Sequence, residues 1–204
     1  MKKSFWSEPY LWIHASGLAV LPLALGVCWL GLAAGDPVFP VWLEYLAIAL
    51  VGIVPIFAMQ WFRPFNIFSI LLICLRPEVL SEEQRRILSL FKLPSHRLVA
   101  AIAPAILSIV LWKIYVWAPM AAAVTPFPPG WRLVGLAVGA IAFGASNLFL
   151  QVPISVFRVL LTPETTFATT APYPVEQIRS DFTNPGLPVR QILPPMKEEW
   201  SAKG

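Results

Sequence analysis

The chain has few charged residues and few of the side chains on which enzyme and metal chemistry depend. Only 13% of its 204 residues are Asp, Glu, Lys or Arg, and it contains two histidines and two cysteines. It has no glycine-rich phosphate loop, no H-E-x-x-H pattern, no cysteine pair at metal-ligand spacing and no nucleophile elbow. These absences predict a protein that is not an enzyme and has no metal site.

The cysteines and the net charge argue against two further classes. Cys28 and Cys74 are too few for a disulfide framework, and the topology described below places them toward opposite faces of a membrane, so we do not expect them to pair. The net charge of +4 does not indicate nucleic-acid binding, because the basic residues flank apolar runs instead of forming one patch.

Apolar residues dominate what is present: they make up 57% of the chain, and the mean hydropathy is +0.70. Runs of about twenty apolar residues can cross the hydrocarbon as helices. The sequence therefore predicts an all-α integral membrane protein whose domain, residues 1–161, has spans at 10–34, 41–61, 98–117 and 131–152. A cleaved signal peptide is the competing interpretation of the first run. However, that run exceeds a typical signal core, and no clean A-x-A site precedes Asp36.

Basic residues are missing from the loops 35–40 and 118–130, and this asymmetry predicts the orientation. Of the fifteen Lys and Arg residues, thirteen lie at the N-terminus, between the second and third spans, or after Pro153. Loops rich in Lys and Arg stay on the cytoplasmic side, so both termini are predicted to be cytoplasmic. Lys113 and Arg132 are the exceptions, and we expect them to reach the surface from the span ends. Glu44 is likewise expected to reach water.

The segment between the second and third spans, residues 64–92, is predicted to lie at the membrane interface. Residues 64–75 are apolar but too short to cross, which favours an interfacial or re-entrant helix. Ser81-Glu82-Glu83-Gln84 matches the capping box and opens a predicted amphipathic helix that ends near Lys92. Residues 154–161 resemble the apolar segment after the second span. This echo is typical of two duplicated helix hairpins, although chance similarity between apolar stretches also explains it.

Residues 162–204 contain seven prolines and scattered apolar side chains, which predict an extended cytoplasmic arm. The regular apolar residues favour an arm that orders across a partner over one that stays solvated. Together with the amphipathic helix, the arm supplies the predicted partner-binding residues, which are Arg85, Arg86, Phe91, Tyr173, Phe182 and Ile192.

Within the spans, a few residues are candidates for binding or packing. His14 is the only histidine in a span and could ligate the magnesium of a chlorophyll, although a lone histidine there more often hydrogen-bonds within the protein. Gly135 and Gly139 form a small-residue strip that predicts close helix packing. Asn147 and Gln151 lie one turn apart and are expected to hydrogen-bond between helices. No ionisable pair lies near mid-membrane, which counts against a coupled transporter but leaves a neutral substrate open.

Five stretches carry a resemblance to a known family. They are SFWSEPYLWIHASGLAVLPL, FRPFNIFSILLICLRPE, QRRILSLFK, SNLFLQVPISVFRVLLTPE and YPVEQIRSDFTNPGLPVRQILPP. Over residues 4–195 the chain resembles the cyanobacterial low-complexity tail membrane proteins. The resemblance implies a thylakoid protein with its basic side toward the cytoplasm and no established catalytic role. Residues 196–204 do not resemble the long repetitive tail of that family, so nothing is carried over from the tail.

The leading hypothesis is a non-catalytic accessory or assembly factor, or a small subunit, of a photosystem or another thylakoid complex. Its predicted partners are the lipid bilayer and photosystem subunits, and no nucleic acid. One alternative is a membrane protein that binds chlorophyll or carotenoid, with His14 as the candidate chlorophyll ligand. The other is a small transporter built on the repeated helix pair, which would need a polar cavity at mid-membrane between the two halves.

Overall fold

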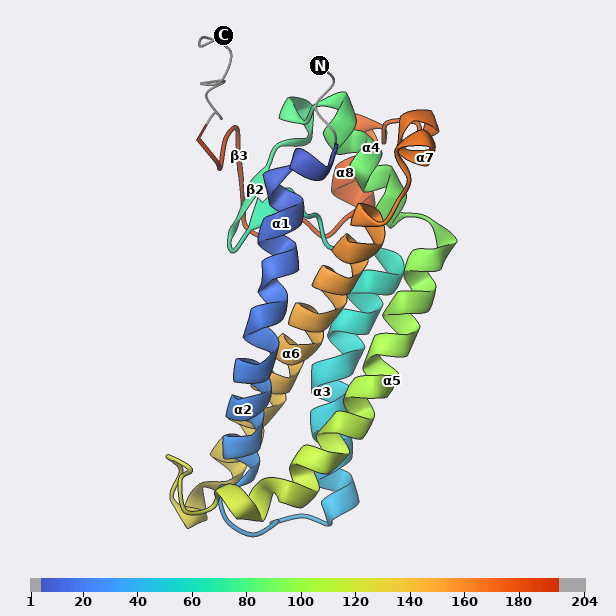
Figure 1. The fold of residues 1–204 in the computed structure, drawn as a ribbon. Helices are drawn as coiled ribbons and strands as arrows, with labels where there is room; N and C mark the ends of the chain where they lie inside the picture. The colour runs from blue at the N-terminus through green and yellow to red at the C-terminus, as the bar shows by residue number, and fades with distance from the viewer. Residues whose placement is uncertain (1–4, 195–204) are drawn as a thin grey trace, which may run out of the picture.

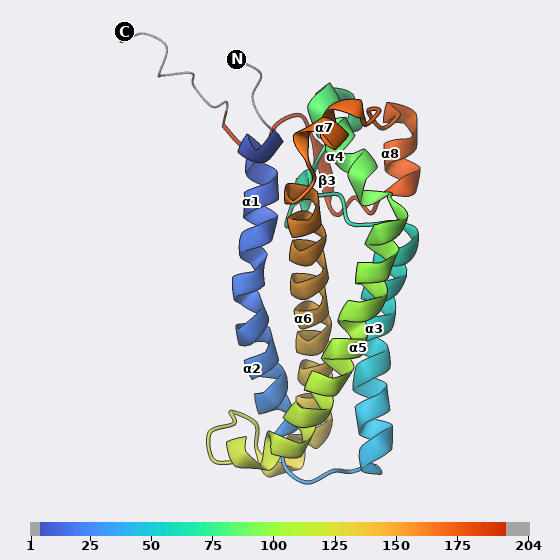
Figure 2. The same ribbon diagram turned by 45° about the vertical axis from the view of Figure 1, so that its right-hand side comes forward.

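Four long helices stand side by side in one bundle (Figures 1 and 2). The computed structural model describes residues 5–194, except for the side chains at positions 94–96 and 99. The first span, Pro9–Leu32, is made of α1 (Pro9–Ser16), a 3-10 turn (Gly17–Val20) and α2 (Leu21–Leu32). The others lie in α3 (Val41–Phe62), α5 (Pro94–Trp117) and α6 (Arg132–Leu160). All four are long and apolar enough to cross a membrane, which confirms the predicted four-span, all-α class.

Helix α6 lies at the centre of the bundle, where α2, α3 and α5 all pack against it. The buried core between these helices contains Leu107, Leu111 and Phe143 together with small residues such as Ala140 and Ala142. Small side chains let helix backbones approach closely, which is how membrane helices gain packing energy in the absence of water. The bundle is therefore held by close contacts with α6.

Helix α6 runs through Pro153 to Leu160, so residues 154–161 extend the fourth span and do not form a separate interfacial segment. A proline inside a membrane helix removes one backbone hydrogen bond, and neighbouring helices can compensate for that loss. Here Gly17, in the 3-10 turn of the first span, lies against Phe149 and Pro153, and a Cβ at position 17 would lie 3.3 Å from the Phe149 ring. The missing side chain at Gly17 thus lets the two spans meet at the proline.

At one end of the bundle, residues 5–8, 63–93 and 161–194 fold together into a compact unit, which we call the head (Figure 1). Its helices are α4 (Glu82–Phe91), α7 (Glu164–Thr169) and α8 (Val175–Asp181). Its sheet has the order β1 (Ser69–Ile70), β2 (Ile73–Leu75) and β3 (Leu187–Val189), with β1 antiparallel and β3 parallel to β2. The capping box at Ser81 and Gln84 is present, as predicted.

The head differs from the sequence expectation for residues 64–75, which form a β-hairpin instead of a helix. Ile70 and Ile73 are paired across it, and β-branched side chains suit a strand better than a helix. The third strand, β3, comes from more than one hundred positions further along the chain. Local periodicity could not show this pairing, because the partner strand is distant in sequence.

The C-terminal segment is also not extended away from the protein, because it folds back across the head. The Thr183 amide donates to the Pro64 carbonyl at 3.0 Å, and the Leu187 amide donates to the Leu72 carbonyl at 2.8 Å. Ile178 and Phe182 are fully buried in the head core. The scattered apolar residues of this segment thus cover the protein's own core. Residues 195–204 lie outside the described range.

Replacing Gly186 should detach β3 from β2. Gly186 has φ +78°, and a Cβ there would lie 1.8 Å from the Leu72 carbonyl oxygen, so Gly186→Ala is both strained and blocked by backbone. We expect the amides of Arg76 and Leu187, which pair the strands, to lose most of their hydrogen-exchange protection. Gly130→Ala is the matched control because nothing lies within 4 Å of its Cβ. Unchanged protection in Gly186→Ala would contradict the β2–β3 pairing.

Candidate functional site

The predicted partner-binding residues come together where the C-terminal segment crosses α4. The Arg85 guanidinium donates to the Tyr173 carbonyl at 3.2 Å, and the Tyr173 amide donates back to the Arg85 carbonyl at 3.1 Å. The Tyr173 ring meets the Phe182 ring edge-on, with 5.2 Å between their centroids. Arg86 donates to the Ala168 carbonyl at 3.4 Å. These residues therefore contact the protein's own C-terminal segment.

Two further predicted residues lie inside the head or beside it. Phe91 and Phe182 are buried in its core, 2% and 0% exposed. Ile192 is half-buried and lines a groove of about 330 Å³ together with Tyr10 and Leu75. Near the junction of head and bundle, the exposed apolar residues include Trp6, Trp12, Phe62 and Leu161. The residues selected from sequence thus support the head, and its free surface is formed by others.

Charged groups at the end of α8 tie it to α4. The Tyr173 hydroxyl donates to the Asp181 carboxylate, and this bond, with a second from Ser180, holds the pKa of Asp181 below its ordinary value. Burial and the same bond raise the pKa of Tyr173. Lys92, just after α4, places its ammonium 5.1 Å from the centroid of the Phe182 ring, and burial lowers the pKa of Lys92.

Acid should loosen the C-terminal segment through Asp181. The pKa of Asp181 is lower in the folded state than its ordinary value of 3.8. The stabilisation that Asp181 contributes to the fold is therefore complete above pH 3.8, and it is lost as the pH falls through the lower pKa of the folded state. Asp181→Asn should cost about 1 kcal/mol of local stability at neutral pH, because the site is partly open to water. The same substitution should also make the local stability depend less on pH in the acid range. Hydrogen exchange of α8 against pH measures both effects, and an unaltered acid profile in Asp181→Asn would contradict the assignment.

His14 is held by groups of its own chain near the start of the first span. Its Nδ1 lies 2.8 Å from the Tyr10 carbonyl oxygen, one turn earlier in the helix. Its ring lies 5.6 Å from the Phe65 ring and also contacts the Ser69 backbone. The ring thus joins α1 to the hairpin of the head. A chlorophyll ligand at this position would have to use the nitrogen that does not face Tyr10.

At the opposite end of the bundle, Glu44 and Arg132 form a buried ion pair that sequence reasoning missed. The Glu44 side chain is 0% exposed and that of Arg132 is 4% exposed. Arg132 Nε donates to Glu44 Oε2 at 3.1 Å, and the Tyr115 hydroxyl donates to the same oxygen at 2.6 Å. The expectation that both charged side chains reach water was therefore wrong, because each one is satisfied inside the protein.

Backbone groups complete this ion-pair site, so that it joins all four spans. Glu44 Oε1 accepts from the amides of Val38 and Phe39, at 2.9 and 3.1 Å, while Arg132 also donates to the carbonyls of Leu32 and Gly35. Glu44 lies in the first turn of α3 and Tyr115 in the last turn of α5, while Arg132 begins α6 and Leu32 ends α2. A buried charged pair is tolerated only when such bonds satisfy its remaining donors and acceptors. The arrangement is suited to fixing helix ends.

Of the two polar side chains that were predicted to bond between helices, Asn147 does so, whereas Gln151 bonds to Asn147 within α6. Asn147 Nδ2 donates to the Gly52 carbonyl of α3 at 3.1 Å, and Gln151 Nε2 donates to Asn147 Oδ1 at 2.7 Å. Gly135 and Gly139 lie against α2, where a Cβ on Gly31 would meet the backbone of both. These contacts assemble the bundle. In the described part of the chain, no group of three or more His, Cys, Asp or Glu residues could hold a metal ion.

The comparisons with known proteins agree with this architecture. No curated protein and no solved structure matches the chain. A family model does match it, from residue 7 to residue 194, and so covers all four spans and nearly the whole head. That model describes low-complexity tail membrane protein-like sequences, and over this range the chain belongs to the low-complexity tail membrane protein-like family.

Proposed function

We propose that this protein is a non-catalytic accessory or assembly factor, or a small subunit, of a photosynthetic complex in cyanobacterial thylakoid membranes. In this proposal it acts by docking, with the head on the cytoplasmic side. The observation that carries the proposal is the folded head. Its core is closed by the protein's own C-terminal segment, which gives a preformed surface above the membrane. Preformed surfaces bind partners without a large ordering cost.

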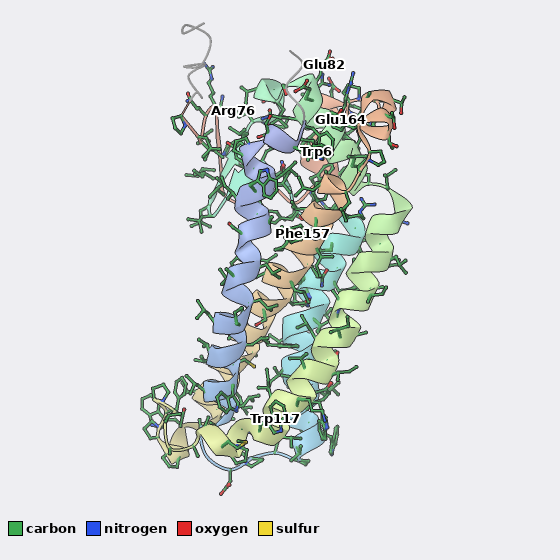
Figure 3. The ribbon with its side chains drawn as sticks, viewed as in Figure 1. Trp6, Arg76, Glu82, Trp117, Phe157 and Glu164 are labelled. Carbon is green, nitrogen blue, oxygen red and sulfur yellow. The ribbon has the colours of Figure 1, made fainter. Side chains whose placement is uncertain are left out.

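The surface at the junction of head and bundle suits a lateral partner. Trp6 is 45% exposed and Phe157 is 38% exposed, and Figure 3 shows both near the junction, on the side of α1 and α6. Trp12 and Leu161 add exposed apolar area there. Farther from the membrane, Glu82 and Glu83 are exposed on the first turn of α4. Apolar anchors beside charged residues are typical of protein interfaces.

Helix contacts within the bundle argue against the transporter alternative. A Cβ on Gly31 would lie 2.5 Å from the Gly135 carbonyl oxygen, and a Cβ on Gly52 would lie 2.5 Å from the Phe143 ring. The first contact joins α2 to α6, and the second joins α3 to α6. At these two levels the halves of the bundle are in van der Waals contact, which leaves no room for a substrate between them.

Affinity purification tests the docking proposal. The protein is tagged after Gly204 and extracted from thylakoid membranes in a mild detergent, and we expect photosystem subunits to co-purify with it. Glu83→Lys reverses one exposed charge on the head and should lower their recovery several-fold. Asp36→Lys reverses an exposed charge at the opposite end of the bundle and serves as the matched control. It should leave recovery unchanged.

Other outcomes would count against the proposal. Recovery of the protein without any photosystem subunit would remove the proposed partner. Loss of recovery in Asp36→Lys, with full recovery in Glu83→Lys, would move the docking surface to the other end of the bundle. An absorption spectrum of the purified protein tests the pigment alternative. Chlorophyll bands that disappear in His14→Phe would establish that alternative instead.

A further inference from the structure

Three leucines are exposed together at one end of the head's sheet. The pairing of Ile70 with Ile73 makes Leu71 and Leu72 a two-residue turn, and their exposed fractions are 87% and 76%. Leu187, at the start of β3, is 72% exposed and donates its amide to the Leu72 carbonyl at 2.8 Å. We call these three residues the leucine tip. An exposed apolar cluster of this kind indicates contact with another apolar phase.

The backbone of the turn favours the same conclusion. Leu71 has φ +52° and is the only non-glycine residue with positive φ in the described part of the chain. Two-residue hairpin turns with positive φ normally take Gly, Asn or Asp, which suit both the conformation and contact with water. A leucine gains neither advantage. Its presence at this position is explained if the turn lies in an apolar environment.

The two ends of the sheet differ in chemical character, one apolar and the other basic. Because β2 and β3 are parallel, both start at the leucine tip and run in the same direction. Arg76 follows β2 directly, and Arg190 follows β3 directly. In Figure 1 the strands run away from the bundle toward the outer end of the head, and Figure 3 labels Arg76 on that outer side. The leucine end of the sheet therefore faces the membrane, and the arginine end faces away from it.

Contacts with α1 place the hairpin at the depth of the membrane surface. Phe68, just before β1, lies 5.4 Å from the Tyr10 ring between centroids, and Phe65 lies 5.6 Å from the His14 ring. Tyr10 and His14 belong to the first turns of the span Pro9–Leu32. Trp12, in the same turns, is 56% exposed, and tryptophan is enriched where acyl chains meet headgroups. The base of the hairpin thus lies at this boundary.

We propose that the leucine tip inserts into the lipid leaflet beside α1 and anchors the head to the membrane surface. The apolar phase that surrounds the leucine tip is therefore lipid. The tip presents aliphatic side chains without a polar pattern, which suits the acyl chains of lipid as a non-directional apolar solvent, while the arginines stay at the end of the sheet that faces away from the membrane. The tip holds the hairpin at a fixed depth, and β3 links this anchor to the folded C-terminal segment.

Site-directed spin labelling tests the anchor. A nitroxide is attached at Leu72→Cys in protein reconstituted into phosphatidylcholine–phosphatidylglycerol vesicles, and its collisions with oxygen and with a water-soluble nickel complex are measured. Ile109→Cys, exposed on α5 within a span, is the lipid reference. Glu82→Cys, at the outer end of the head in Figure 3, is the water reference. The native Cys28 and Cys74 are buried, and unsubstituted protein measures their background labelling.

We expect the oxygen-to-nickel collision ratio at position 72 to exceed that at position 82 at least about fivefold and to approach that at position 109. A label at Leu187→Cys should give the same result, because this residue belongs to the same tip. A ratio at position 72 equal to that at position 82 would overturn the proposal. Shielding of position 72 from both reagents would also overturn it, because that result means that protein covers the tip.

Discussion

Glu44→Gln should be among the most destabilising single substitutions in this protein. The amide keeps one oxygen as acceptor for Val38 and Phe39, but it removes the charge that balances Arg132. An uncompensated buried charge typically costs about 3–5 kcal/mol. For a chain of this size, that cost corresponds to a decrease of about 6–20 °C in the melting temperature. Thermal unfolding in detergent, followed by circular dichroism, measures it.

A second substitution distinguishes the charge from other effects of the change. Replacing both partners, as in Glu44→Gln with Arg132→Met, removes the orphaned charge and should recover much of the lost stability. Asp36→Ala is the control, because Asp36 is an exposed acid at the same end of the bundle and should change the melting temperature very little. A double variant as unstable as Glu44→Gln would show that the charge of Arg132 is not the cause.

The four spans could be predicted from sequence because each depends on a local property, the length of an apolar run. The capping box at Ser81 and the hydrogen bond of Asn147 are also local or follow from the cost of an unpaired polar group in a membrane. Features of this kind are readable one segment at a time. They were enough for the fold class, but not for the head.

The ion pair and the head could not be predicted, because each one joins distant segments. Glu44 and Arg132 lie 88 positions apart, and either residue by itself reads as a charge at a span end. Each charge can be buried only because the two side chains pair with each other between α3 and α6. The hairpin at residues 64–75 likewise depends on β3, so its apolar composition suggested an interfacial helix. One signal was present: charges of opposite sign occur in the first turns of two spans that begin at the same side of the membrane.

Alanine at Gly135 should be far more destabilising than alanine at Gly139, although the sequence motif treats the two glycines alike. A Cβ at position 135 would lie 2.3 Å from the Gly31 carbonyl oxygen and 2.5 Å from the Ala34 Cβ, so α2 and α6 must separate. Overpacking of this kind costs about 1–3 kcal/mol. At position 139 the nearest atom is the Cys28 carbonyl oxygen at 3.5 Å, which is an ordinary contact.

Melting temperatures of the two variants, measured in the same detergent, provide the test. Gly135→Ala should melt about 2–12 °C below the wild type. Gly139→Ala should match the wild type or exceed it, since alanine is the better helix former. Gly26→Ala, on α2 with nothing within 4 Å of its Cβ, controls for that helix propensity. Equal losses at positions 135 and 139 would mean that α2 and α6 approach each other evenly along the motif, which the structure contradicts because their backbones meet most closely where Gly31 lies against Gly135.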